Sequence, residues 1–301
     1  MTWVTLSCLS ALFLGIYDLL KKVSLKDNAV VPVLFISVLS GAAVWTPLTI
    51  WSSLDPDSVP WPHILQVGSL PPAGHIQMAF KALIVGLSWI FAYFAVKHLP
   101  VSIAAPIRAT APLWTISMAV AFMGERPSNW QWLGVVIVLG AFYAFSFVGK
   151  LEGIHFHRDK WVGCMIIATL LGATSSLYDK YLLQNLQLTT PTVQGWFSIY
   201  LVVVLLPFFI WWKFFNPSPS PFHWRWSIPL IGLTLLVTDF LYFSAIRDPE
   251  ALISVISPIR RSAVAVSFLG AFFLFNEKNF RLKFLLILVI LTGILLLNWK
   301  T

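Results

Sequence analysis

Residues 255–264, VISPIRRSAV, place Arg260 and Arg261 side by side in a long stretch that has no other charged residue. A near-copy, AAPIRATAP at residues 104–112, carries Arg108 at the equivalent place. Guanidinium groups are always charged and are costly in apolar surroundings, so each of them needs a partner or a watery cavity. The repetition indicates a chain built from two related halves.

The composition is that of a membrane protein. Hydrophobic residues make up 58% of the chain and charged residues only 11%, whereas a soluble domain is about one quarter charged. The apolar residues fall into blocks of roughly 20, the length that an α-helix needs to cross a bilayer, and not into the short alternating segments of a membrane barrel. The net charge of +8 comes from basic residues scattered over short loops. Scattered charges of this kind suit contact with anionic lipids and argue against nucleic acid as a partner.

Ten apolar blocks predict an all-α integral membrane protein with ten transmembrane helices. The predicted spans are about 3–22, 31–51, 78–97, 101–123, 129–148, 161–184, 192–213, 226–246, 250–275 and 281–299. The longest connection, 52–77, is rich in Pro, Gly and Ser and is predicted to be a loop or a surface segment. The connections are too short for a soluble domain.

Landmarks of the first half recur in the same order in the second. The matched pairs are Tyr17-Asp18 with Tyr178-Asp179, Val31-Pro32 with Thr190-Pro191, Pro106-Ile107-Arg108 with Pro258-Ile259-Arg260, and Glu125 with Glu277. We therefore predict two five-helix repeats, residues 1–150 and 151–301. An odd number of spans makes the second repeat cross the membrane in the opposite sense, and inverted repeats of this kind are typical of transporters.

The basic residues also predict an orientation. Twelve Lys and Arg residues follow odd-numbered spans: Lys21, Lys22, Lys26, Lys97, Lys150, Arg158, Lys160, Lys213, Arg225, Lys278, Arg281 and Lys283. Five lie on the opposite side: Lys81, Arg126, Lys180, Arg247 and Lys300. Because cytoplasmic loops carry the excess of positive charge, both termini are predicted to lie outside.

Two stretches resemble a known family. They are LFLGIYDLLKK at 12–22 and residues 95–142, in which the fourth span ends in Gly124-Glu125-Arg126. The second half has Asn276-Glu277-Lys278 at the matching turn, with Asn in place of Gly. Together with the five-plus-five repeat, this pattern resembles the EamA family of the drug/metabolite transporter superfamily. The resemblance implies a central cavity lined by helices 3, 4, 8 and 9, with help from helices 1 and 6. It also implies transport, usually export, of amino acids, other metabolites or drugs.

The arginines are the strongest candidates for site residues. Arg260 lies about 15 Å from the start of its span and Arg108 about 10 Å from the start of its own. Each follows a proline by two residues, and proline interrupts the helical hydrogen bonds. The planar donor fork of arginine matches a carboxylate or a phosphate. We therefore predict that a small polar solute with an anionic group is bound or gated by Arg108, Arg260 and Arg261.

Two tryptophans and three prolines complete this candidate site. Trp89 and Trp114 lie deep in their spans and are candidates for lining the cavity, although plain packing is the more frequent role of such residues. Pro106, Pro112 and Pro258 are the expected hinges for rocking of the two repeats.

Three aspartates are candidates for charge pairing or coupling. Asp18 is expected near Arg108, and Asp179 near Arg260. These pairs could be structural, could contact the substrate, or could form a gate, and the sequence leaves all three open. Asp239 could carry a coupling proton or serve as the counter-ion of Arg261, and the second role is favoured. Lys21 and Lys22 are expected to be interfacial.

Other functional classes have weaker support. No P-loop, HExxH or GxSxG motif is present, and the histidines have no metal-ligand spacing, so no enzyme activity, cofactor or metal is expected. The predicted function is secondary transport, with export across the cytoplasmic membrane and protons as a candidate coupling ion. The alternatives are a lipid or lipid-phosphate flippase of the same superfamily and a membrane-embedded lipid-modifying enzyme. Two repeats in one chain make a monomer sufficient, and a dimer is compatible.

Overall fold

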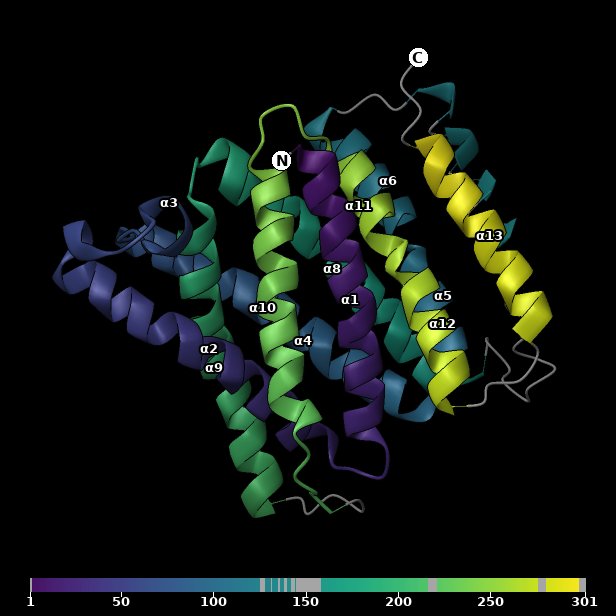
Figure 1. Cartoon of the computed structure of the whole chain (residues 1–301), viewed down its shortest axis with the longest axis horizontal. Helices are drawn as coiled ribbons and strands as arrows, with labels where there is room; N and C mark the ends of the chain where they lie inside the picture. Colours follow the sequence, from purple (N-terminus) through teal and green to yellow (C-terminus); the bar gives the residue numbers. More distant parts are fainter. Residues whose placement is uncertain are drawn as a thin grey trace.

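The structure is a computed structural model that describes residues 2–124, 128–130, 132–134, 136–137, 140–141, 144, 158–215, 221–275 and 280–297. All of the regular elements in these ranges are helical (Figure 1). Within these ranges, seven helical segments are long and apolar enough to cross a membrane: Trp3–Leu25, Val30–Leu54, Pro72–His98, Lys160–Asn185, Thr190–Phe215, Ser227–Ile246 and Val255–Leu274. The chain is thus a multi-pass helical membrane protein.

The helices that the structure describes are of two lengths. The longer ones are α1 (Trp3–Leu25), α2 (Val30–Leu54), α4 (Pro72–His98), α8 (Lys160–Lys180), α9 (Thr190–Phe215) and α10 (Ser227–Ile246). The shorter ones are α3 (Pro62–Leu65), α5 (Val101–Ala109), α6 (Ala111–Met123), α11 (Ile253–Arg261), α12 (Ala263–Phe275) and α13 (Phe280–Leu297). A 3-10 turn spans Pro56–Ser58, and a π-helical turn spans Tyr181–Asn185.

The predicted loop 52–77 is partly helical. It contains the 3-10 turn, α3 and the beginning of α4, which starts at Pro72 instead of at residue 78. Pro71 and Pro72 explain the early start, because proline has no N–H to lose at the first position of a helix and already has a helical φ. The longer α4 carries Lys81 into the interior of the protein.

Helices from the two halves of the chain pack against each other through small residues. Ser10 of α1 donates a hydrogen bond to the Thr238 carbonyl oxygen of α10 (2.8 Å), and Ser88 of α4 donates one to the Ala168 carbonyl oxygen of α8 (2.8 Å). Figure 1 shows α1 beside α10, with α2 and α9 on one side of them and α13 at the far edge. Close approach through small and hydroxylic residues is how helices associate where lipid supplies no hydrophobic drive.

Two predicted spans are each broken in two. The span predicted at 101–123 is α5 and α6, and the span predicted at 250–275 is α11 and α12. The last predicted span corresponds to α13. The predicted span at 129–148 lies partly outside the described residues, and the turns at Glu125 and Glu277 lie wholly outside them.

Candidate functional site

The two broken helices are interrupted at equivalent positions. α5 ends before Thr110 and α11 ends before Ser262, in each case two residues after an arginine. The hydroxyl of Thr110 donates to the Ile107 carbonyl oxygen at 2.7 Å, and that of Ser262 to the Ile259 carbonyl oxygen at 2.7 Å. Such local side-chain bonds compete with the helical ladder. The interruption therefore falls one turn beyond each proline, and not at the proline itself.

The four short helices meet where they are interrupted. α5 packs on α12, and α6 packs on α11. The Ser257 hydroxyl of α11 lies 3.4 Å from the Thr115 hydroxyl of α6 in a buried contact. This arrangement brings Arg108, Arg260 and Arg261 to the walls of one cavity, although they come from opposite ends of the sequence.

Asp18 of α1 is the centre of a first charge cluster. Its Oδ1 accepts hydrogen bonds from Arg108 of α5 and from Lys21 Nζ, the latter at 3.0 Å. Ser267 of α12 lies 3.5 Å from its other oxygen. A carboxylate between two cations satisfies more than one buried charge, which stabilises ionised groups away from water. The Asp18–Arg108 pair anticipated from the sequence is thus present, with a second cation added.

Lys21 is not an interfacial residue, contrary to the sequence prediction. Its side chain is only 1% exposed because α1 continues to Leu25 and places it inside the helical bundle. Its Nζ lies 4.5 Å from the ring centroid of Tyr17 and 5.4 Å from that of Tyr93. Aromatic faces stabilise a desolvated ammonium group.

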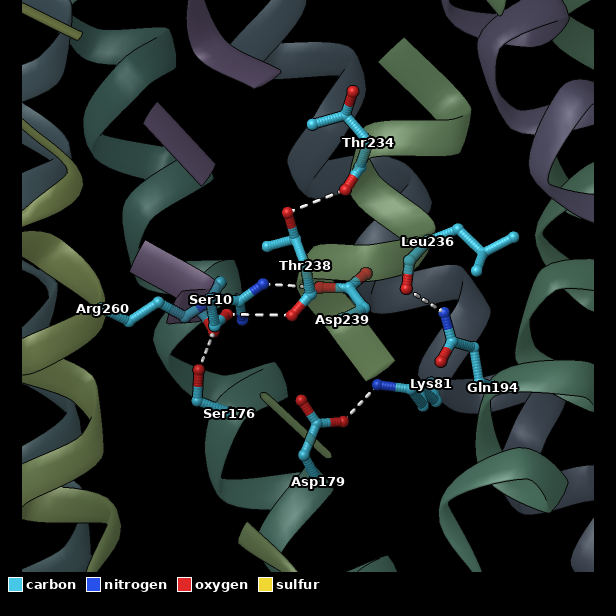
Figure 2. Close-up of polar contacts among 11 residues, drawn as sticks. Ser10, Lys81, Ser176, Asp179, Gln194, Thr234, Leu236, Thr238, Asp239 and Arg260 are labelled. Carbon is cyan, nitrogen blue, oxygen red and sulfur yellow. Dashed lines mark hydrogen bonds and ion pairs between the residues drawn. The ribbon is translucent and has the colours of Figure 1, made fainter. Parts of the chain in front are cut away.

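Asp179 of α8 pairs with Lys81 of α4, and not with Arg260 as predicted (Figure 2). Lys81 is 2% exposed and lies over the rings of Phe197 and Phe243, at 4.4 and 4.8 Å from their centroids. The prediction was wrong because Lys81, near the start of the span predicted at 78–97, was counted with the basic residues of one membrane side and was given no partner in the interior. With α4 starting at Pro72, Lys81 is on a helix that packs directly on α8 and reaches Asp179 first.

Arg260 of α11 pairs with Asp239 of α10 at 2.5 Å (Figure 2). Its guanidinium carbon lies 3.9 Å from the ring centroid of Tyr242. Asp239 is therefore the counter-ion of Arg260, and the prediction that it neutralises Arg261 was wrong. Successive residues on a helix point about 100° apart, so Asp239 can face only one of the two arginines.

Arg261 has no ion-pair partner among the described residues. The Nε atoms of both Arg260 and Arg261 are buried without a hydrogen-bond acceptor. Buried polar groups are normally satisfied, so unpartnered donors of this kind indicate a missing ligand or water.

The charged groups surround a cavity of about 110 Å³. Its walls come from α1, α4, α5, α8, α9, α10 and α11, and thus from both halves of the chain. Trp89 lies in the wall, whereas Trp114 of α6 is half-buried and does not line the cavity. Ser88, Ser176 and Gly172 add small polar surface. The site is a chamber with charged, small polar and apolar residues in its wall.

Sequence reasoning missed Lys81 and the aromatic residues that accompany the lysines. The double proline at 71–72 was the available signal, since proline at the first helical position moves the helix start from residue 78 to Pro72 and puts Lys81 nine residues into the helix instead of three. Tyr93 and Tyr242 carry no signal in the sequence, because many aromatic residues in this chain simply pack.

Comparisons with known proteins agree with this architecture. Residues 1–147 match the model of the EamA-like transporter family. No curated protein is detectably similar to the chain. A solved structure described only as "Crystal structure of protein" superposes with a TM-score of 0.68 over 98% of this chain and 96% of its own length, at 14% sequence identity. At that identity the likeness shows the fold alone.

Proposed function

We propose that this chain, which over residues 1–147 belongs to the EamA-like transporter family, is a secondary transporter that moves a small polar solute by alternating access. The observation that carries the proposal is the buried, charged cavity at the meeting point of the two interrupted helices. Charged groups in the interior of a membrane protein mark a solute pathway by default. The cytoplasmic membrane is the expected location, export the expected direction, and no catalytic step is required.

The helix pairings support an inverted repeat of ten helices, residues 1–150 and 151–301. α1 packs on α10 as α8 packs on α4, and α5 packs on α12 as α11 packs on α6. α2 and α9 pack on each other. Among the helices that the structure describes, α1, α2, α4, α5 and α6 thus have the partners that their counterparts would have after a two-fold rotation, as expected for repeats related by an axis in the membrane plane.

The interruptions supply the flexible points of the proposed mechanism. At Thr110 and Ser262 the helical ladder is weakened, so the segments on either side can tilt separately. Pro106, Pro112 and Pro258 lie close to these points and act as hinges. The Asp18–Arg108 pair joins α1 to α5, and the Asp239–Arg260 pair joins α10 to α11. Alternate opening of the two pairs would expose the cavity first to one side and then to the other.

Asp239 is the proposed coupling residue. It lines the cavity, is largely buried, and holds Arg260 by a single direct contact. Protonation of this carboxylate would release the guanidinium, so that solute movement and proton movement would be linked.

Reconstitution tests both parts of this proposal. The full chain is placed in liposomes, and lumenal pH and labelled solutes are followed with a panel of amino acids, organic acids, phosphorylated metabolites and cationic drugs. We expect one solute class to move together with protons. Asp239→Asn should abolish the proton signal while leaving solute counterflow measurable.

The matched control is Asp27→Asn. Asp27 is exposed in the turn after α1 with φ of 51°, a conformation that Asn tolerates, so this variant removes a carboxylate outside the cavity. Solute movement without any proton signal in the wild type would contradict the coupling role of Asp239. Failure of every solute in the panel to move would contradict transport itself.

A further inference from the structure

Three guanidinium groups converge on one point of the cavity. Arg108, Arg260 and Arg261 line both the main cavity and a smaller void of about 10 Å³ beside it. The three residues come from α5 and α11, whose interruptions bring them together. Like charges at such close quarters repel one another strongly in a low-dielectric interior. Their convergence is stable only where negative charge is supplied.

The carboxylates around the site supply too little negative charge to balance the cations. The cationic residues that line the cavity are Lys21, Lys81, Arg108, Arg260 and Arg261. The carboxylates are Asp179 and Asp239 in the same cavity and Asp18 in the smaller void. Among the described residues, two positive charges are therefore left uncompensated when all of these groups are ionised.

One of the two uncompensated charges belongs to the Lys21–Arg108 pair that shares Asp18, and the other lies on Arg261. Lys81 and Arg260 each have their own aspartate, and Lys21 shares Asp18 with Arg108. Arg261 has no carboxylate within ion-pair distance among the described residues, and its Nε has no acceptor. The Nε of Arg260 is unpartnered as well. Buried donors without acceptors, on adjacent arginines that face a cavity, form a receptor for an oxyanion.

We propose that the solute is a small dianion, a phosphate monoester or a dicarboxylate, and that Arg261 is its principal ligand; this proposal rests on the proposed function. Two negative charges match the excess of two positive charges. The planar forks of the arginines match the paired oxygens of a carboxylate or a phosphate. The cavity of about 110 Å³ restricts the solute to a compact molecule.

A ligand series of constant size tests the charge requirement. The wild-type protein in detergent at pH 7 is heated with succinate, succinamate or succinamide, which carry two, one and no negative charges. Glycerol 3-phosphate and glycerol form a second pair that separates phosphate from carboxylate recognition. We expect the midpoint of thermal unfolding to rise with dianions, to rise less with succinamate, and not to change with the neutral compounds. Equal stabilisation by succinate and succinamide would overturn the proposal.

Arg261→Gln tests the assigned ligand. We expect the apparent dissociation constant of the dianion to rise by about tenfold or more, as for the loss of a charge-assisted hydrogen bond. The unliganded variant should be at least as stable as the wild type, because an uncompensated buried charge has been removed. A merely structural arginine would give the opposite change in stability.

The matched control is Arg225→Gln. Arg225 lies just before α10, outside the cavity, where it donates a hydrogen bond to the Val23 carbonyl oxygen at 2.5 Å. This variant should keep the affinity for the dianion. If Arg261→Gln kept that affinity within about twofold, the assignment of Arg261 would be overturned. Should the Gln variant not fold, the ligand series on the wild-type protein decides alone.

The binding assay separates this proposal from the proposed function. Dianion binding that depends on Arg261, in a protein that moves no solute in liposomes, would support the anion site and contradict transport. Transport of a neutral or zwitterionic solute, with no stabilisation by dianions, would support transport and contradict the dianion.

Discussion

Asp18 in α1 and Asp179 in α8 each follow a tyrosine at the same place in their halves of the chain, yet their surroundings differ. Asp18 holds two cations, Lys21 from its own helix and Arg108 from α5. Asp179 forms an ion pair with one cation, Lys81 of α4. Arg260 forms its ion pair with Asp239 instead. The two halves therefore share a helical pattern but not a charge pattern.

The difference follows from single residues on the neighbouring helices. Lys81 in α4 and Asp239 in α10 have no charged counterparts in the other half of the chain. Lys81 pairs with Asp179 and Asp239 pairs with Arg260, so no described carboxylate is left for Arg261. The molecule thus holds one tightly cross-linked charge cluster around Asp18 and a second, more open set of charged residues that faces the cavity.

The largest expected effect is the loss of Asp18. Asp18→Asn leaves both Lys21 and Arg108 buried without a carboxylate, whereas Asp179→Asn leaves only Lys81. Breaking one buried pair costs about 3–5 kcal/mol, so Asp179→Asn should lose about that much and Asp18→Asn more. Denaturant unfolding in mixed micelles measures both. Equal losses of unfolding free energy in the two variants would mean that Asp18 stabilises only one of its two cations.

A smaller effect is expected from packing around the same two helices. A Cβ at Gly15 of α1 would lie 2.4 Å from the Val266 Cβ and 3.1 Å from the Ala263 carbonyl oxygen, and both of these residues are in the first turn of α12. Gly15→Ala should therefore push α1 from α12 and destabilise the protein by about 1–3 kcal/mol.

The control for this prediction is a glycine of α8, the helix that carries Asp179. At Gly172 of α8 the nearest atom to an added Cβ is the Ser88 hydroxyl at 3.8 Å, an ordinary contact. Gly172→Ala should cost nothing, and the helical preference of alanine favours a gain of up to about 1 kcal/mol. If both variants behaved alike in the same unfolding assay, the tighter packing of the Asp18 side would be refuted.

The smallest effect is expected where a whole ion pair is exchanged for apolar groups. Lys81→Met combined with Asp179→Leu removes both charges and leaves no buried group unpaired, so unfolding stability should stay within about 1–2 kcal/mol of the wild type or rise. Each single substitution should destabilise the protein much more than the double substitution does. A double variant as unstable as Asp179→Asn would show that the pair is needed for folding and not only for charge balance.

Much of the architecture could be predicted from local patterns. Apolar blocks of membrane-spanning length marked the long helices, and the repeated Pro-Ile-Arg element located the two interrupted ones. The Asp18–Arg108 pair followed from depth alone, since both residues lie in spans of known length. The ion pairs of Asp179 and Asp239 could not be derived from the sequence. They depend on where α4 begins and on how α10 is rotated about its axis, and only one or two residues determine each of these features.

The amino-acid sequence by itself determined that this is a helical membrane protein, because the length of its apolar segments is a property of the chain alone. It also required that its buried arginines have partners. Only the tertiary structure decided which partners these are. An ion pair in a low-dielectric interior depends on contact within a few ångströms, and such contacts join α1 to α5, α4 to α8 and α10 to α11 only after the helices have packed. The same packing left Arg261 facing the cavity without a carboxylate from the part of the chain that the structure describes.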